Sequence, residues 1–351
     1  MRPESLLLPT PSGVFCESGG FYIDPTRPVD KAVITHGHSD HARAGHGAVL
    51  ATQDTLDIMR LRYGADFAGT TQAIGYGESV DLNDVRVTFH PAGHVLGSAQ
   101  IAVERKGLRI VASGDYKDVP DPTCAPFELV RCDVFITEAT FGLPVFRHPD
   151  ASGEIARLLH SLTVFPERAH LVGAYTLGKA QRVMALIRQA GYREPIYLHG
   201  AMESLSRFYL SRGIDLGELV PVRDRQKADL AGTITLCPPS ALKEVWSRRF
   251  PDPVTCYASG WMRIRARARQ SLVQLPMVIS DHADWDGLRA TITATGASEI
   301  WVTHGQEDAL VHWCESKGLR GRPLAIVGYG DEDETDGTGN APTVQAEAAP
   351  A

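Results

Sequence analysis

The chain has 351 residues, of which 43% are hydrophobic, so it can bury the core of one large domain or of two ordinary ones. No run of about 18 apolar residues occurs, which argues against a membrane span, and the three-leucine core near the N-terminus is too short for a secretory signal. The six cysteines lie far apart without a CxxC pair, so we expect scattered thiols in a reducing cytoplasm rather than a thiolate zinc site or a disulfide framework.

The net charge of −7 is concentrated at the C-terminus. Residues 331–351 contain six acidic and no basic side chains, so removing their six charges from −7 leaves −1 for the rest of the chain. This segment is polar and nearly free of large apolar residues, which predicts a disordered acidic tail. The overall charge therefore argues neither for nor against a nucleic-acid partner.

In chain order, the N-terminal third alternates short β-like runs with Gly, Pro and Asp breaks. Within it, VERKGLRIV predicts two strands around a Lys-Gly turn, and TLDIMRLRYG has a helical pattern. From about residue 150 helical and strand-like stretches alternate, in the order SGEIARLLHSL, HLVGAY, GKAQRVMALIRQAGY and PIYLHG. This alternation predicts a parallel sheet covered by helices. The strand-like runs PMVIS and EIWVT follow near the end.

Six of the β-like runs end in side chains that bind metals or transfer protons. The first run, KAVIT, is followed by His36, His38, Asp40 and His41, and the later runs lead to His94, Asp115, Glu138, His282 and His304. If these strands point the same way, the side chains converge at one edge of the sheets, where open α/β folds place their sites.

Histidine and aspartate without cysteine make nitrogen and oxygen sites suited to Zn²⁺, Mn²⁺ or Fe²⁺. We predict two cations: one held by His36, His38 and His94, the other by Asp40, His41 and His304, with Asp115 bridging them. Such a pair lowers the pKa of bound water to about 7 and neutralises charge on an attacked phosphoryl group. Structural zinc sites close with four protein ligands, so the cluster predicts a hydrolase.

Two further motifs indicate contacts with phosphate. GAYTLGK, residues 173–179, matches GxxxxGK, but Ala180 lacks the hydroxyl that an NTPase uses for Mg²⁺. Its strand–Gly–helix pattern instead offers Lys179 and backbone N–H groups to a nucleic-acid phosphate. RIRARAR, which contains Arg263 and Arg265, would put its arginines on one face of a strand, against the phosphates of a single strand, or spread them around a helix. A solvated basic surface is the alternative.

The motifs resemble the metallo-β-lactamase superfamily: HGHSDH, His94 in GHVLGS, Asp115 in SGDY and His304 in THG. TEATFG with Glu138, SDHAD with His282 and THGQ with His304 are similar to the extra motifs of its β-CASP nuclease branch. Other stretches, such as SGDYKDVPDPTCAPFE, GAYTLGKAQRV and SGWMRIRARAR, resemble bacterial exonucleases that accompany an ATP-dependent DNA ligase and a large helicase. The resemblance spans roughly residues 5–330.

The resemblance implies an α/β fold, a metallo-β-lactamase αββα sandwich with an inserted β-CASP α/β domain. The sandwich would comprise residues 1–142 and 277–330, the insertion residues 143–276, and the acidic tail residues 331–351. In this family the acid of the first extra motif orients the histidine of the second, which implies that Glu138 orients His282. His282 would then protonate the leaving oxygen or stabilise the pentavalent phosphate, and Asp40 would help to hold the attacking water.

The resemblance further implies two divalent ions, zinc in the first place with manganese as the alternative, and nucleic acid as the substrate. The leading interpretation is an exonuclease of single-stranded DNA, with 5′ to 3′ polarity, that acts in DNA repair beside a ligase and a helicase. The alternative is an RNA-processing endo- or exoribonuclease of the mRNA 3′-end type, because a histidine rather than a valine at position 304 is common in RNA-acting members. A small-molecule hydrolase would not explain the insertion, Glu138 or His282, and scaffold subunits typically have broken ligand sets.

Overall fold

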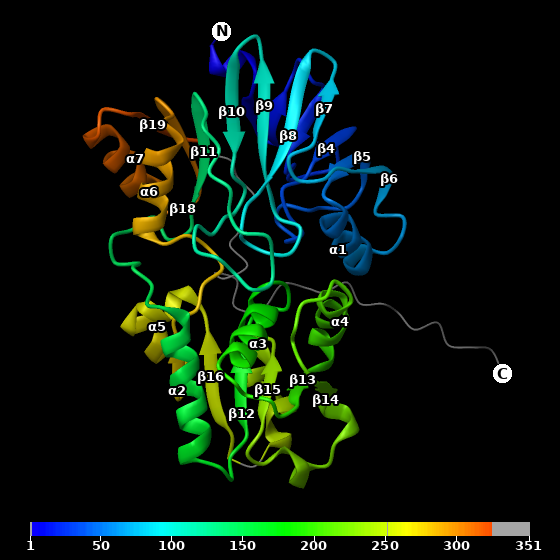
Figure 1. Cartoon of the computed structure of the whole chain (residues 1–351), viewed down its shortest axis with the longest axis vertical. Coiled ribbons are helices and arrows are strands. Elements are labelled where there is room, and N and C mark those ends of the chain that lie inside the picture. The colour runs from blue at the N-terminus through cyan, green and yellow to red at the C-terminus, as the bar shows by residue number, and fades with distance from the viewer. Residues whose placement is uncertain (1, 251, 325–351) are drawn as a thin grey trace, which may run out of the picture.

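The computed structural model describes residues 2–250 and 252–324, which form two units built on β-sheet (Figure 1). The body, residues 2–142 and 278–324, contains two sheets, and the middle unit, residues 143–277, contains the third. The predicted acidic tail, residues 331–351, lies outside the described residues. None of the helices in the described part of the chain combines the length and the apolar character that crossing a bilayer requires.

The first sheet of the body has the strand order β1-β2-β3-β4-β5-β6. Its strands are β1 (Leu8–Thr10), β2 (Gly13–Cys16), β3 (Phe21–Ile23), β4 (Lys31–Val33), β5 (His46–Ala51) and β6 (Ala68–Ala73). The first three pair antiparallel, and β3 to β6 pair parallel. The carboxyl ends of β3 and β4 therefore lie at the same edge of this sheet.

The second sheet has the order β19-β18-β11-β10-β9-β8-β7. Its strands are β7 (Ser79–Leu82), β8 (Val85–Pro91), β9 (Ala99–Arg105), β10 (Leu108–Ala112), β11 (Val134–Ala139), β18 (Glu299–Gly305) and β19 (Arg320–Pro323). The antiparallel pair β9 and β10 is the hairpin predicted from VERKGLRIV. Because β9 is antiparallel to both neighbours and β10, β11 and β18 are mutually parallel, β8, β10, β11 and β18 all end at one edge.

The two sheets of the body face each other across one apolar core. Phe21 and Val33 of the first sheet share this core with Phe89, Ile101 and Trp301 of the second, and all five are almost fully buried. Each such side chain contributes roughly 1.5–3 kcal/mol through removal from water. This core fixes the two carboxyl edges relative to each other.

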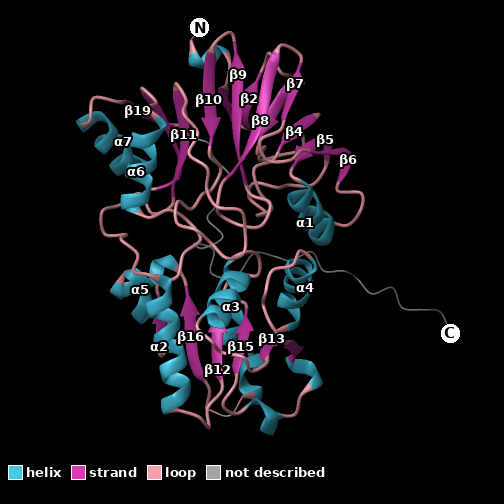
Figure 2. Ribbon diagram, viewed as in Figure 1, coloured by secondary structure: helices cyan, strands magenta, loops and turns pink. Residues whose placement is uncertain are grey.

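Helices cover the outer faces of the body. Helix α1 (Gln53–Tyr63) packs Leu56 and Met59 on the first sheet, and helices α6 (Trp285–Thr295) and α7 (Glu307–Ser316) cover the second. The layers run helix, sheet, sheet, helix (Figure 2).

The middle unit has a parallel six-stranded sheet with the order β14-β13-β15-β12-β16-β17. Its strands are β12 (His170–Gly173), β13 (Ile196–Leu198), β14 (Leu219–Pro221), β15 (Ile234–Cys237), β16 (Val254–Ala258) and β17 (Leu275–Met277). Helices α2 (Ala151–Val164), α3 (Lys179–Gln189) and α4 (Glu203–Ser211) pack on one face. The predicted alternation of helix and strand is thus confirmed, and the chain is mixed α/β.

The structure corrects the expected place of PMVIS and decides between the two alternatives for RIRARAR. The strand-like run PMVIS contributes only its first residues to a strand, and β17 is the edge strand of the third sheet rather than a strand of the body. RIRARAR forms the end of a 3-10 turn, Gly260–Arg263, and the short helix α5 (Arg265–Gln270), so its arginines spread around a helix.

Candidate metal centre

Ligand-type side chains from four segments converge where the strands of the body end. One group comprises His36, His38, His94 and Asp115, each of which offers a ligand atom within 4.8 Å of the others. His38 Nδ1 lies 3.2 Å from His36 Nε2 and 3.0 Å from His94 Nε2, and Asp115 Oδ2 lies 3.4 Å from His36 Nε2. All four residues are buried.

A second group shares Asp115 with the first. It contains His41, Asp115 and His304, again with ligand atoms within 4.8 Å of one another. His41 Nε2 lies 3.4 Å from Asp115 Oδ2 and 3.6 Å from Asp40 Oδ2, and the rings of His41 and His304 stack with centroids 4.7 Å apart. Asp115 Oδ2 therefore faces both groups, as a bridging carboxylate would.

The residues present fit divalent cations. Asp115 Oδ1 is buried and has no hydrogen-bond partner among the described residues, which is costly unless a cation or another polar group meets it. Imidazole nitrogens and carboxylate oxygens without thiolate are a donor set that zinc and manganese accept. The buried clusters could therefore hold metal ions.

His304 reaches the second group through an irregularity in its strand. Along β11 and β18, Glu138 pairs with Thr303 and Ala139 pairs with Gly305, so the register skips His304, which is the extra residue of a β-bulge. Its φ of 58° lies in the left-handed region, which is rare for a non-glycine residue. Such β-bulges redirect a side chain, and strained backbone of this kind clusters at functional sites.

Asp24 orients one histidine of each group, His41 directly and His36 through Thr35. The sequence analysis did not identify it. Its Oδ2 lies 2.8 Å from His41 Nδ1 and accepts a hydrogen bond from Thr35 Oγ1 at 2.6 Å; Thr35 Oγ1 in turn lies 3.0 Å from His36 Nδ1. Carboxylates in this position fix the orientation of ligand imidazoles. Asp24 directly follows β3, so the strand-end signal that identified the other residues could have found it.

Backbone carbonyl groups orient two further histidines of the first group, His94 and His38. His94 Nδ1 lies 2.9 Å from the carbonyl oxygen of Asp281, and His38 Nε2 lies 3.2 Å from that of Leu177, a residue of the middle unit. Gly93 makes the turn before His94 with φ 75°, and a Cβ there would meet the carbonyl oxygen of Lys117 at 2.4 Å. Only glycine allows this close approach.

The electrostatics favour neutral imidazoles in most of the cluster. Burial lowers the pKa of His94 and that of His304 to about 3, and it lowers the pKa of His36 well below its usual range, helped by the neighbouring His41. A neutral imidazole is the form that binds a cation.

His41 and Asp115 behave differently because they face each other. Burial opposes charge on His41, but Asp115 and then Asp40 outweigh it and raise the pKa of His41 well above its usual range. Burial likewise opposes the ionised form of Asp115, and His41 and His36 nevertheless hold its pKa well below the ordinary value. The cluster thus presents an ionised carboxylate.

Glu138 and His282 form a buried pair beside the clusters. Glu138 Oε2 lies 2.9 Å from His282 Nδ1, and its Oε1 accepts a 2.7 Å hydrogen bond from the backbone N–H of Tyr116. Burial raises the pKa of Glu138; burial opposes charge on His282, but Glu138 raises the pKa of His282 well above its usual range. The pair holds His282 so that Nδ1–H donates to Glu138, and the His282 ring lies 4.5 Å from that of His94.

The three residues predicted to contact the substrate differ in their exposure to solvent. Arg263 and Arg265 are exposed at the start of α5. Lys179 is only 1% exposed, and its Nζ lies 3.1 Å from Asp281 Oδ1. Its ammonium group is thus buried against a carboxylate of the body, and a phosphate contact of Lys179 stays a prediction.

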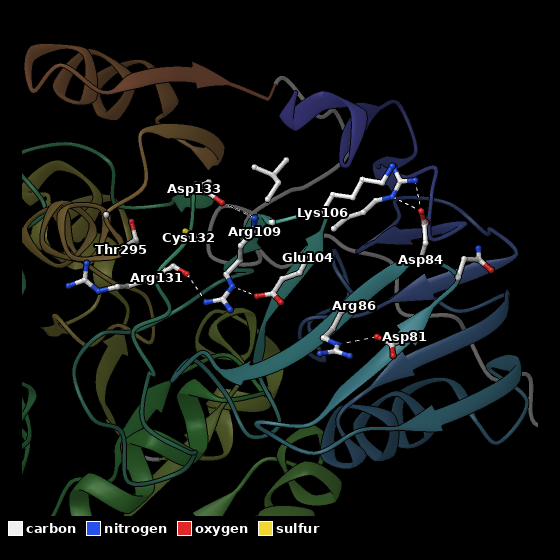
Figure 3. A pocket seen from close by; sticks show the side chains of 15 residues that line it. Asp81, Asp84, Arg86, Glu104, Lys106, Arg109, Arg131, Cys132, Asp133 and Thr295 are labelled. Carbon is white, nitrogen blue, oxygen red and sulfur yellow. Dashed lines mark hydrogen bonds and ion pairs between the residues drawn. The ribbon is translucent and has the colours of Figure 1, made fainter. Parts of the chain in front are cut away.

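An open groove of about 840 Å³ on the second sheet lies apart from the metal-ligand residues (Figure 3). Its charges largely neutralise each other, since Arg109 pairs with Glu104 and Arg105 with Asp84. The groove therefore lacks the convergent ligands that mark the centre described above.

The layered fold and the buried clusters describe a mixed α/β protein whose side chains could hold metal ions, and comparisons identify relatives. A protein named "Probable DNA ligase" from Opitutus terrae is 27% identical over 312 residues, which are 88% of this chain and 30% of the relative. Endoribonuclease YSH1 from Eremothecium gossypii is 34% identical over 199 residues, 45% of this chain and 26% of the relative. The chain thus spans about a third or less of the length of these relatives.

These relatives are members of the β-CASP metallo-β-lactamase family, and the resemblance found in the sequence motifs is confirmed. The search of family models found no match. A crystal structure of a protein of unknown function from Enterococcus faecalis V583 covers 86% of this chain and 80% of its own, with a TM-score of 0.57 and 12% identity. This likeness concerns the fold alone.

Proposed function

We propose that the chain is a metal-dependent phosphodiesterase that acts on nucleic acid, in the first place as an exonuclease of single-stranded DNA. One observation carries the proposal: the buried Glu138–His282 pair lies beside Asp115, the carboxylate that faces both groups. Asp115, Glu138 and His282 offer polar atoms within 4.8 Å of one another. A purely structural metal site would not need this pair.

Two ions would be held by seven side chains. His36, His38 and His94 would bind one, Asp40, His41 and His304 the other, and Asp115 would contact both. Zinc suits these ligands best, with manganese as the alternative. When bound, such ions supply Lewis acidity and a water of lowered pKa.

Residues of the chain would deliver the proton to the leaving oxygen and orient the attacking water. Glu138 accepts the Nδ1–H of His282 and so leaves His282 Nε2 as the atom that delivers a proton to the leaving oxygen. The raised pKa of His282, which Glu138 causes against the effect of burial, supports its role as an acid near neutral pH. Asp40, beside His41, would orient the attacking water.

The architecture supports the same assignment. The four layers of the body would correspond to a metallo-β-lactamase sandwich formed by residues 1–142 and 277–330. Residues 143–276 would be the inserted β-CASP domain, and the end of β17 at Met277 would lie at the return to the sandwich. We propose a cytoplasmic location, because six scattered thiols without a disulfide framework suit a reducing compartment.

The preference for DNA rests on the relative named as a ligase, in which a segment similar to 88% of this chain forms 30% of the protein. Such a segment suggests that the two activities serve one pathway, so we propose functional association with an ATP-dependent DNA ligase and a helicase in DNA repair. The exposed Arg263 and Arg265 would contact the phosphates of the strand.

An RNA-processing nuclease is the second candidate. YSH1 is named an endoribonuclease and is 34% identical in the shared region. The histidine at position 304 also favours RNA. The site chemistry would be the same, and only the polymer would differ.

A single assay separates these candidates. Purified protein with Zn²⁺ or Mn²⁺ is incubated with end-labelled single-stranded DNA and RNA of matched sequence, beside the variant His282→Ala. Mononucleotide release from DNA, abolished in the variant, supports the leading proposal, and label at the 5′ or 3′ end reports its polarity. Preferred internal cutting of RNA would support the second candidate, and activity on neither polymer would refute both.

A further inference from the structure

A short segment of the middle unit, residues 177–179 at the start of α3, contacts residues of the candidate metal centre. Lys179 is the first residue of this helix, and its Nζ lies 3.1 Å from Asp281 Oδ1. The two residues are 1% and 2% exposed. Two buried charges from different units thus meet within salt-bridge distance.

Asp281 stands between two histidines of the site. Its carbonyl oxygen lies 2.9 Å from His94 Nδ1, and its Oδ1 lies 3.9 Å from His282 Nε2. Lys179 therefore holds the residue that orients His94 and that directly precedes His282. A shift of Asp281 would move both histidines.

The same segment contacts another predicted ligand directly. The carbonyl oxygen of Leu177 lies 3.2 Å from His38 Nε2. Gly178 has φ 83°, and a Cβ there would meet Val95 Cγ1 at 2.3 Å, so the backbone passes as close to the body as a glycine allows. One turn later, Arg182 pairs with the buried Asp121 of the body.

We propose that Lys179, acting through Asp281, is a positioning residue that couples docking of the middle unit to metal affinity and to the placement of His282. Removing a partner that orients a metal-ligating imidazole typically changes metal affinity 10- to 100-fold. Removing Lys179 also takes away the ammonium group that lies nearest to the buried Asp281 carboxylate, which favours a rearrangement of the chain around it. The part of the inference that concerns His282 rests on the proposed function, whereas the part that concerns metal affinity does not.

The test measures Zn²⁺ affinity without substrate, by competition with a chromophoric chelator. Lys179→Met should weaken Zn²⁺ binding about 10- to 100-fold, and Lys179→Arg, which keeps the charge, should recover most of it. The matched control is Arg212→Met, because Arg212 of the middle unit pairs with Asp54 and Asp57 of the body away from the ligands. It should bind Zn²⁺ like the wild type.

Wild-type Zn²⁺ affinity in folded Lys179→Met would overturn the inference, as would equal weakening in Arg212→Met. If Lys179→Met fails to fold, the double variant Lys179→Met/Asp281→Asn is measured instead, because it also removes the charge of Asp281. Wild-type Zn²⁺ affinity in the double variant would likewise overturn the inference. With nucleic acid, Lys179→Met at saturating Zn²⁺ should lower kcat and leave KM unchanged. A wild-type chain that binds Zn²⁺ but cuts no nucleic acid would refute the proposed function and leave the affinity test intact.

Discussion

Asp24 Oδ2 lies 2.8 Å from His41 Nδ1, and this contact turns His41 Nε2 toward Asp115. The same carboxylate accepts hydrogen bonds from the N–H and hydroxyl groups of Thr35, at 2.8 and 2.6 Å. Asp24 is 4% exposed and follows the short strand β3. A residue outside the HGHSDH motif thus fixes the ring of a ligand within it.

Replacing Asp24 by Ala should weaken metal binding about 10- to 100-fold, because the His41 ring is deprived of the acceptor that orients it. Asp24→Asn keeps an acceptor oxygen and should fall between Asp24→Ala and the wild type. Metal content after dialysis against graded chelator concentrations measures the effect. Asp66→Asn, at an exposed position of the body, is the control, and equal metal loss in both would contradict the role of Asp24.

His282→Ala and Asp115→Ala should separate chemistry from metal binding. His282→Ala should lower kcat about 100- to 10,000-fold, the usual contribution of a positioned acid, with metal content unchanged. Asp115→Ala should lose metal, because Asp115 Oδ2 faces both groups. Metal analysis beside single-turnover rates measures both properties, and equal metal loss in the two variants would refute the division of roles.

Metal binding should stabilise the fold, since the ligands come together only in the folded chain. Free Zn²⁺ at about 100 times its Kd should add about 2.7 kcal/mol to the free energy of unfolding and raise Tm. Thermal unfolding with and without Zn²⁺ measures this shift. Asp115→Ala should show a much smaller shift, and an identical one would place the bound zinc elsewhere.

Arg182→Met should destabilise the protein by about 3–5 kcal/mol, because it leaves the buried Asp121 carboxylate unpaired. Arg182 and Asp121 have side-chain exposures of 5% and 1%. The control is Arg86→Met, which breaks the exposed pair with Asp81 on the second sheet and should leave stability unchanged (Figure 3). Urea unfolding distinguishes them, and similar midpoints would show that the Arg182 pair is dispensable.

Arg263→Gln combined with Arg265→Gln should weaken binding of single-stranded nucleic acid. In a plot of the logarithm of the affinity against the logarithm of the salt concentration, the slope should become shallower by about 0.7 for each phosphate that the arginines neutralise in the wild type. Affinities measured across a series of salt concentrations provide the slope. Lys106→Gln combined with Arg131→Gln removes two charges from the remote groove and serves as the control. An unchanged slope in the first variant would favour a solvated basic surface.

The convergence of these side chains could be predicted because its signal is local: each lies at or beyond the end of a strand, and parallel strands end together. His36, His94 and Asp115 were found in this way. The contacts between units could not be predicted, since the burial of Lys179 depends on how α3 docks on the body. In the GxxxxGK pattern a lysine that binds phosphate and a lysine that binds Asp281 look the same.

The assignment of PMVIS shows a second limit. An apolar run of this length fits any sheet, and only the pairing partner decides which sheet it joins. Pairing with β16 placed β17 in the third sheet, so the chain leaves the edge of the middle unit at Met277 and enters the body shortly before His282.

The β-bulge at His304, which the register between β11 and β18 skips, separates this side chain from the alternation of the strand. A substitution there changes one ligand of the second group without shifting the inward and outward alternation of β18, because the ladder skips that residue. The φ of 58° limits which residues fit there, because β-branched side chains are strained in the left-handed region. Replacing His304 by a residue that accepts this backbone, such as Asn, would therefore alter the second group while the pairing of the sheet is kept.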